Sequence, residues 1–295
     1  MVEVFKGNSK SSPGKDCSKS SPGKDCSKSS PGKDYSNKNS VKAVVFDLDE
    51  TLGSFSDLYL LWTGIKHIYP DFQNFSALLD VYPEFLRCNI LYILQYLYQK
   101  KIDQVCNKMY IYTNNQCQSR EWVYLIMEYF NYKVISEISP IPSKEIILFD
   151  KVISAFKIGN TPIELSRTTH EKTYSDLIKT TMLPINTEFC FIDDTEYIRM
   201  KTEKVYYVCP QAYIHMLSVS EIIDRFIHSK TIFDDDFIKM ENSNYKLLTS
   251  FTYWTNWFSM NHRSSSFNSP KIDEKHELNR IISKKIMYYI REFFL

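Results

Sequence analysis

Residues 44–52 read VVFDLDETL, and this stretch decides the fold class. The apolar run that ends at Phe46 is short and β-branched, which is typical of a buried strand. Asp47 and Asp49 follow at once, so two carboxylates stand where the strand ends. In open α/β sheets, ligands bind outside the carboxyl ends of the strands. We therefore expect a strand that delivers Asp47 and Asp49 to a ligand site.

Four further apolar runs of this kind follow along the chain, with helical patterns between them. The runs cover residues 108–112, 151–156, 188–192 and 204–208. Ser119 precedes a helical pattern that contains Trp122 and Tyr129, and Ser220 precedes another that contains Ile222. Strands that alternate with helices predict an α/β fold, in which a parallel sheet carries helices on both faces.

Residues 1–41 are predicted to be a disordered tail. Residues 8–16 read NSKSSPGKD, and residues 17–25 and 26–34 both read CSKSSPGKD. This unit has no large apolar side chain to bury, and its Ser, Lys, Pro and Gly content favours disorder. Residues 1–42 carry nine lysines and four acidic residues, so they are basic although the whole chain has a net charge of +1. We interpret the tail as a solvated linker, with weak contact to nucleic acid as the alternative.

The rest of the chain is predicted to form one catalytic domain and an extension. Residues 42–230 contain the strands, and residues 54–107 are interpreted as a helical insertion or small cap after the first strand. Residues 231–295 form an extension that ends in an amphipathic helix. Its aromatic stretch 251–258 is interpreted as internal packing, with a surface for a partner or for base stacking as the alternative.

The sequence gives no sign of a membrane or a secretory route. No apolar run reaches the roughly 18 residues of a membrane span, and the N-terminus lacks the apolar region of a secretory signal. The seven cysteines form no C-x-x-C pair, which is typical of free thiols in a reducing compartment. We expect an intracellular protein, cytoplasmic or nuclear, with no membrane partner.

Polar residues also end two other predicted strands. Thr113 and Asn114 follow the second strand, and Asp193 and Asp194 follow the fourth. Because parallel strands end at one edge of a sheet, these residues should meet the two carboxylates of the first strand. Four carboxylates that meet need a cation, and Mg²⁺ prefers oxygen ligands and shares its shell with phosphate and water. The sequence therefore predicts a Mg²⁺ site.

Phosphate binding by a glycine-rich loop is excluded. The chain has seven glycines, and only Gly53, Gly64 and Gly159 lie beyond residue 34. Neither the dinucleotide-binding fingerprint nor the P-loop can be built from these three. A phosphate site in this chain has to use side chains and a bound cation.

These motifs resemble those of the haloacid dehalogenase (HAD)-like phosphotransferases, a superfamily with a Rossmannoid sheet. VVFDLDETL is similar to the first motif, in the variant of the phosphatases that act on the C-terminal domain of RNA polymerase II. IYTNN, with Thr113, is similar to the second motif, and CFIDD, with Asp193 and Asp194, to the fourth. Lys172 matches the lone lysine of the third, although Lys179 follows nearby and either could be a solvated helix residue. The resemblance covers about residues 42–230.

The resemblance implies the chemistry of the carboxylates. Asp47 would be the nucleophile and a Mg²⁺ ligand. Asp49 would be the general acid and base, and would also reach the metal through its backbone carbonyl. Asp193 would complete the metal shell, with Asp194 close to it. The polymerase phosphatases typically have Asp-Asn in place of Asp193-Asp194, so their substrate is not implied.

The resemblance also implies the residues that bind the substrate. Thr113 would hydrogen-bond the phosphoryl oxygens, and Lys172 would neutralise their charge. Asn114 either binds phosphate or fixes the turn after its strand. Arg167 and His170 flank the lysine and could touch the substrate, although a surface role is the simpler interpretation.

The implied activity is that of a Mg²⁺-dependent phosphatase that works through an aspartyl-phosphate. Its substrate would be a phosphomonoester on a protein, a nucleic-acid end or a small molecule. One alternative is a catalytically idle HAD-like module that recruits partners through its tail and C-terminal helix. Another is a nucleic-acid 3′-phosphatase whose lysine-rich tail adds affinity. The segments RTTHEKTYSDLIKTTMLP, FCFIDDTEYIRM and VYYVCPQAYIH also resemble uncharacterised HAD-like proteins of large DNA viruses.

Overall fold

A mainly parallel six-stranded sheet forms the centre of the computed structural model, and the fold is α/β. The strand order is β1-β8-β7-β2-β3-β4, and β1 alone among these strands is antiparallel to its neighbour. The strands are β1 (Val2–Lys6), β2 (Lys42–Phe46), β3 (Lys108–Tyr112), β4 (Lys151–Ile153), β7 (Glu188–Ile192) and β8 (Val205–Pro210). The short strands β5 (Lys157–Ile158) and β6 (Thr161–Pro162) pair separately.

The structure describes residues 1–7, 40–68, 70, 72–115, 121–138, 146–229, 253, 255–256, 260 and 272–295. The strands predicted at 108–112 and 188–192 are confirmed, whereas the one predicted at 151–156 ends at Ile153. In the described part of the chain, no helix is both long and apolar enough to cross a membrane.

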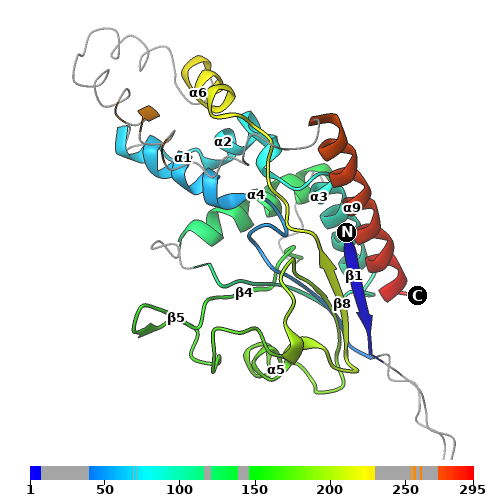
Figure 1. Cartoon of the computed structure of the whole chain (residues 1–295). Helices are drawn as coiled ribbons and strands as arrows, with labels where there is room; N and C mark the ends of the chain where they lie inside the picture. Colours follow the sequence, from blue (N-terminus) through cyan, green and yellow to red (C-terminus); the bar gives the residue numbers. More distant parts are fainter. Residues whose placement is uncertain are drawn as a thin grey trace, which may run out of the picture.

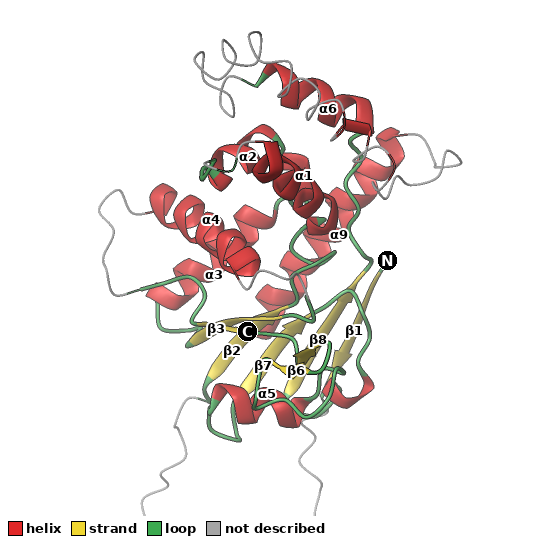
Figure 2. Cartoon of the chain, turned by 90° about the vertical axis from the view of Figure 1, so that its left-hand side faces the viewer, coloured by secondary structure: helices red, strands yellow, loops and turns green. Residues whose placement is uncertain are grey.

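Helices cover both faces of the sheet, as predicted, but unequally (Figures 1 and 2). They are α1 (Phe55–Ile68), α2 (Phe75–Val81), η1 (Pro83–Phe85), α3 (Ile90–Ile102), α4 (Glu121–Ile138), α5 (Tyr174–Thr181), η2 (Ile198–Met200), α6 (Val219–His228) and α9 (Ile272–Phe293). Figure 2 shows α5 on one side of the sheet and α3, α4 and α9 on the other.

The two faces of β2 build two separate cores because side chains alternate along a strand. Val44 and Phe46 are fully buried in the larger core, which also contains the helix residue Leu94. Ala43 and Val45 face the smaller core under α5. Burying one large apolar side chain contributes about 1.5–3 kcal/mol, so both cores fix the position of β2.

The segment 54–107 is helical, as predicted, and belongs to the larger core. Phe55 and Leu58 of α1 and Leu78 of α2 are buried in the same cluster as Val44. The helices of this segment therefore pack on the sheet through shared apolar side chains.

The prediction of a disordered tail over residues 1–41 is wrong at its start. Val2–Lys6 forms β1, which pairs with β8 from Val2 opposite Pro210 to Lys6 opposite Tyr206. The reason is local, because VEVFK places valines two residues apart, as a strand does. Residues 8–39, which hold the repeats, lie outside the described residues. The repeats thus stand between two strands of one sheet.

The last helix, α9, lies beside β1 and β8 (Figure 1). Lys42 Nζ donates to the carbonyl oxygen of Phe293 at 2.7 Å, and Tyr206 Oη donates to Glu292 at 2.7 Å. The end of the predicted extension is therefore fixed to the sheet edge. Of the aromatic stretch 251–258, the described residues include Tyr253, which is exposed.

The start of α6 differs by two residues from the prediction. Ser218, and not Ser220, is the N-cap, because Ser218 and Glu221 form a reciprocal capping box. The helix predicted after Ser119 is α4, although Ser119 itself lies outside the described residues. The described cysteines Cys88, Cys106, Cys190 and Cys209 are free thiols, as expected.

Candidate active site

The candidate site lies at the carboxyl edge of the sheet, where the strand order reverses. From β2 the chain builds β3 and β4 on one side, and then β7 and β8 on the other. Asp47 follows the last residue of β2, Asp193 follows β7 and Thr113 follows β3. Such a switch point is where open α/β sheets bind their ligands. The structure thus places these three predicted residues on neighbouring strand ends.

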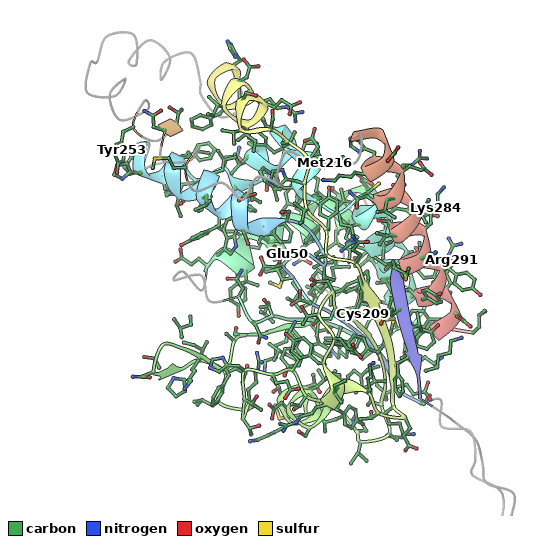
Figure 3. The ribbon with its side chains drawn as sticks, in the orientation of Figure 1. Glu50, Cys209, Met216, Tyr253, Lys284 and Arg291 are labelled. Carbon is green, nitrogen blue, oxygen red and sulfur yellow. The ribbon has the colours of Figure 1, made fainter. Side chains whose placement is uncertain are left out.

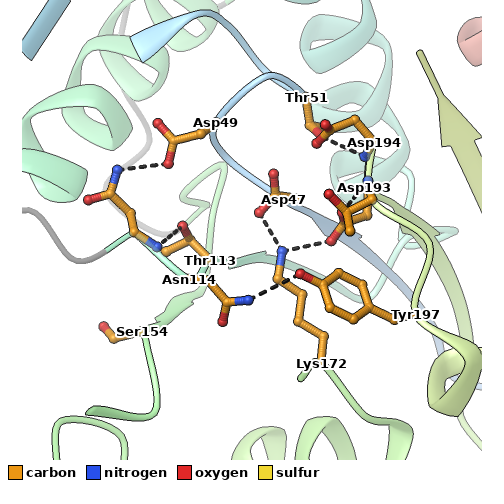
Figure 4. A network of polar contacts seen from close by, with 12 residues as sticks. Asp47, Asp49, Thr51, Thr113, Asn114, Ser154, Lys172, Asp193, Asp194 and Tyr197 are labelled. Carbon is orange, nitrogen blue, oxygen red and sulfur yellow. Dashed lines mark hydrogen bonds and ion pairs between the residues drawn. The ribbon is translucent and has the colours of Figure 1, made fainter. Parts of the chain in front are cut away.

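Lys172 connects two of these strand ends (Figure 4). Its Nζ atom donates to Asp193 Oδ2 at 2.7 Å and also to Asp47 Oδ1. The lysine is 1 % exposed, so it is a buried cation. Lys179, the alternative, is exposed on α5. The geometry therefore favours Lys172 as the lysine that belongs to the site.

Three carboxylates lie close enough together to hold one metal ion. Ligand atoms of Asp47, Asp193 and Asp194 all lie within 4.8 Å of one another. Thr51 Oγ1 donates to Asp194 Oδ1 at 3.0 Å and accepts from the Asp194 amide at 3.0 Å, which fixes the third carboxylate. Carboxylate oxygens are the ligands that Mg²⁺ prefers.

Lys172 and the carboxylates around it shift one another's pKa values. Burial alone would lower the pKa of Lys172, but the carboxylates of Asp193 and Asp47 outweigh burial and raise that pKa. Burial raises the pKa of Asp193, and the nearby Asp47 adds to the rise, whereas Lys172 opposes it. Burial and Asp47 also raise the pKa of Asp194. The single positive charge of Lys172 therefore does not balance the three carboxylates of Asp47, Asp193 and Asp194.

The Asp49 side chain is not part of the three-carboxylate group. Asn115 Nδ2 donates to Asp49 Oδ2 at 2.7 Å, and Asp49 Oδ1 is buried without a hydrogen-bond partner. Burial, followed by repulsion from Asp47, raises the pKa of Asp49 to about 7. A carboxyl group with this pKa can donate and accept a proton near neutral pH. Metal binding by its backbone carbonyl stays a prediction.

The loop after β2 has a tight, supported conformation. The Leu52 amide donates to Leu48 O at 2.9 Å, and Glu50 adopts a positive φ of 58°. The buried side chain of Arg87 donates through Nε to Thr51 O at 2.5 Å and through Nη2 to Glu50 O at 2.5 Å. Arg87 lies within segment 54–107, so that segment holds the loop that carries the carboxylates.

Gly53 closes this loop and has no space for a side chain. A Cβ atom on Gly53 would lie 2.5 Å from the backbone oxygen of Phe85. The Glu50 amide donates to Gly53 O at 2.7 Å. Glycine is therefore required here by close approach of the backbone.

Thr113 and Asn114 lie at the end of β3, as predicted. Thr113 Oγ1 accepts from the Asn115 amide at 2.9 Å, and the Thr113 side chain is buried. Asn114 Nδ2 donates to Tyr197 Oη at 3.1 Å. Of the two roles considered for Asn114, fixing the local structure agrees with this bond. A role in phosphate binding stays a prediction.

Arg167 is buried, so the expected surface role is wrong for this residue. Its Nη1 donates to Thr113 O at 3.2 Å and to Ser154 O at 2.9 Å. Its Nη2 donates to Asn114 Oδ1 at 2.7 Å and to His170 O at 3.0 Å. One guanidinium thus joins the loops after β3 and β4 to the segment that leads to Lys172. His170 itself is exposed.

Sequence reasoning missed several residues that shape the site. They are Thr51, Arg87, Asn115 and Tyr197, and the part that Arg167 plays in joining the loops was not predicted either. Thr51 and Asn115 carried a signal, since they belong to the quoted motifs VVFDLDETL and IYTNN. Arg87 and Tyr197 carried none, because their partners are far away in the sequence.

No protein-family model, no curated protein and no solved structure matches this chain.

Proposed function

We propose that the protein is a HAD-like, Mg²⁺-dependent phosphatase that works through an aspartyl-phosphate. The observation that carries the proposal is the grouping of Asp47, Asp193 and Asp194 around Lys172 at the switch point of the sheet. The order of the motifs along the sequence agrees with the proposal. The substrate class is a phosphomonoester.

The donor set fits Mg²⁺. Asp47, Asp193 and Asp194 offer hard oxygen atoms within reach of one ion, and the lysine leaves them undercompensated. Bound Mg²⁺ would neutralise charge on the phosphoryl oxygens. The three aspartates are the residues that would hold it.

Asp47 and Asp49 can carry out the reaction in two steps, formation and then hydrolysis of the aspartyl-phosphate. In the first, a carboxylate oxygen of Asp47 forms a bond to phosphorus, the ester P–O bond breaks, and Asp49 gives its proton to the leaving oxygen. In the second, Asp49 takes a proton from water, the water oxygen bonds to phosphorus, and the bond to Asp47 breaks. Lys172 and Thr113 would stabilise the phosphoryl oxygens throughout.

The pKa of Asp49 suits this double role. A group with a pKa of about 7 is protonated in part of the molecules and ionised in the rest at neutral pH. Proton transfer by a well-placed group contributes about 10²–10⁴-fold to rate. Asn115 holds the side chain by one oxygen.

The test is hydrolysis of an aryl phosphate by the purified full chain with Mg²⁺. Asp47→Asn should abolish turnover, and Asp49→Asn should reduce it by about 10²-fold or more. Asp224→Asn is the control, because Asp224 is an exposed acid on α6. Activity that survives in Asp47→Asn, or that is unaffected by EDTA, would contradict the proposal. Complete inactivity of the wild type toward several phosphate donors would favour the idle module.

A further inference from the structure

A groove lies between α3 and α9, and its side chains have no part in the candidate site. Its volume is about 430 Å³. The principal lining residues are Asn89, Tyr92, Ser283, Lys284, Tyr288 and Arg291. The floor is apolar and includes Met287. The groove therefore combines an apolar base with polar and cationic walls.

The walls of the groove present aromatic rings and positive charge together. Tyr92 is 56 % exposed and Tyr288 is 61 % exposed, so both rings are accessible to a ligand. Lys284 and Arg291 stand two turns apart on α9, and Figure 3 labels both on this helix. None of the residues found to line the groove is acidic. The surface is complementary to an anion that also carries flat rings.

Two details indicate that the groove is preorganised. Arg291 lies over the Tyr96 ring at 5.4 Å and its Nη2 donates to Tyr92 Oη at 3.4 Å, so the guanidinium is oriented along the wall. Ser283 is 1 % exposed, lines the groove, and its hydroxyl has no hydrogen-bond partner. A buried polar atom without a partner is uncommon in native proteins, and a small polar group or water held in the groove would satisfy it.

We propose that this groove binds single-stranded nucleic acid. Proteins that hold single strands stack bases on exposed aromatic rings and place Lys or Arg along the phosphate backbone. Tyr92 and Tyr288 supply the rings, and Lys284 and Arg291 supply the cations. An acidic peptide would use the same cations but would leave two exposed tyrosine rings without a function.

The strand residues that flank the basic repeats, Lys6 and Lys42, lie beside the end of α9. Lys6 forms an ion pair with Glu292, and Lys42 donates to Phe293 O at 2.7 Å. These lysines are the last and first strand residues on either side of segment 8–39, which carries seven lysines and three aspartates. A nucleic-acid strand that leaves the groove near Arg291 would pass close to Lys6 and Lys42.

The experiment measures binding of a fluorescein-labelled 15-mer, in DNA and RNA forms, to the full chain by anisotropy. Tyr288→Ala should weaken binding about tenfold through the lost stacking. Tyr132→Ala is the matched control, because Tyr132 on α4 is also 61 % exposed, and it should leave affinity unchanged. A double substitution, Lys284→Ala with Arg291→Ala, should make the slope of log K against log[salt] less negative by about 1.4.

Several results would overturn the proposal. They are absence of binding at 50 mM salt, equal affinities of Tyr288→Ala and Tyr132→Ala, and equally tight binding of a labelled Glu-rich peptide. Binding that is lost on deletion of residues 17–34 but is unchanged by the groove substitutions would also overturn it. Circular dichroism of each variant confirms that it is folded. The outcome does not depend on phosphatase activity.

Discussion

Lys172 Nζ lies 2.7 Å from Asp193 Oδ2 and also donates to Asp47, so one buried lysine joins the ends of β2 and β7. This ammonium is in direct contact with two of the three acids that could hold a metal. The positive charge of Lys172 therefore contributes to holding the carboxyl ends of β2 and β7 together.

Replacing Lys172 by Met should destabilise the protein. Loss of one partner from a buried ion pair leaves uncompensated charge, so the free energy of unfolding in EDTA should fall by about 3 kcal/mol. Mg²⁺ should restore part of this loss, because it binds the folded state and supplies positive charge. Urea unfolding with EDTA or Mg²⁺ measures both effects. Lys179→Met, at an exposed site of α5, is the control, and equal losses in the two variants would contradict the assignment.

Arg167→Met should loosen the loops around the site. The substitution removes four hydrogen bonds from the guanidinium to groups after β3, after β4 and before Lys172. We expect a loss of about 3 kcal/mol in unfolding free energy and a drop in kcat of about 10²-fold. Arg167→Lys should rescue little, because an ammonium lacks the planar fork. Arg199→Met is the exposed control, and a full rescue by lysine would refute this role.

The charge state of Asp49 should leave a trace in the pH dependence of stability. Its pKa is about 7 in the folded protein, against an ordinary value of 3.8. Between pH 3.8 and about 7 the folded state binds more protons than the unfolded state. The free energy of unfolding therefore falls as pH rises through this window, and it levels off above pH 7. In EDTA the loss attributable to Asp49 should be about 4 kcal/mol. Asp49→Asn should remove it, and identical pH profiles of wild type and variant would disprove the shift.

Deleting residues 1–7 should destabilise the domain, whereas deleting two repeats should not. The first deletion removes β1 from β8 and the Lys6 ion pair with Glu292. We expect a loss of about 2–4 kcal/mol from exposed apolar area and unpaired backbone groups. Deletion of residues 17–34 leaves both anchoring strands intact. Thermal unfolding compares the two, and equal melting temperatures would show that β1 contributes nothing.

The elements that the sequence predicts well are those with a local signal. β2 and its two aspartates follow from nine consecutive residues, and the strand-end rule then brings Asp193 to Asp47. The buried, loop-joining role of Arg167 could not be predicted, since its carbonyl partner on Thr113 is 54 residues away and any residue type offers a carbonyl. β1 was not predicted, because its partner, β8, lies about 200 residues further along the chain and because the repeats dominate the composition of the N-terminus.

Because segment 8–39 is anchored at both ends, the stability of the fold depends very little on the number of repeats. Lys6 lies opposite Tyr206 of β8, and Lys42 lies opposite Glu188 of β7. Both anchors are therefore at the amino ends of the parallel strands, opposite the strand ends that carry Asp47. The entropy of closing a connection grows only with the logarithm of its length, so one more nonapeptide costs about 0.2 kcal/mol. The free energy of unfolding should therefore change little when one nonapeptide is added or removed.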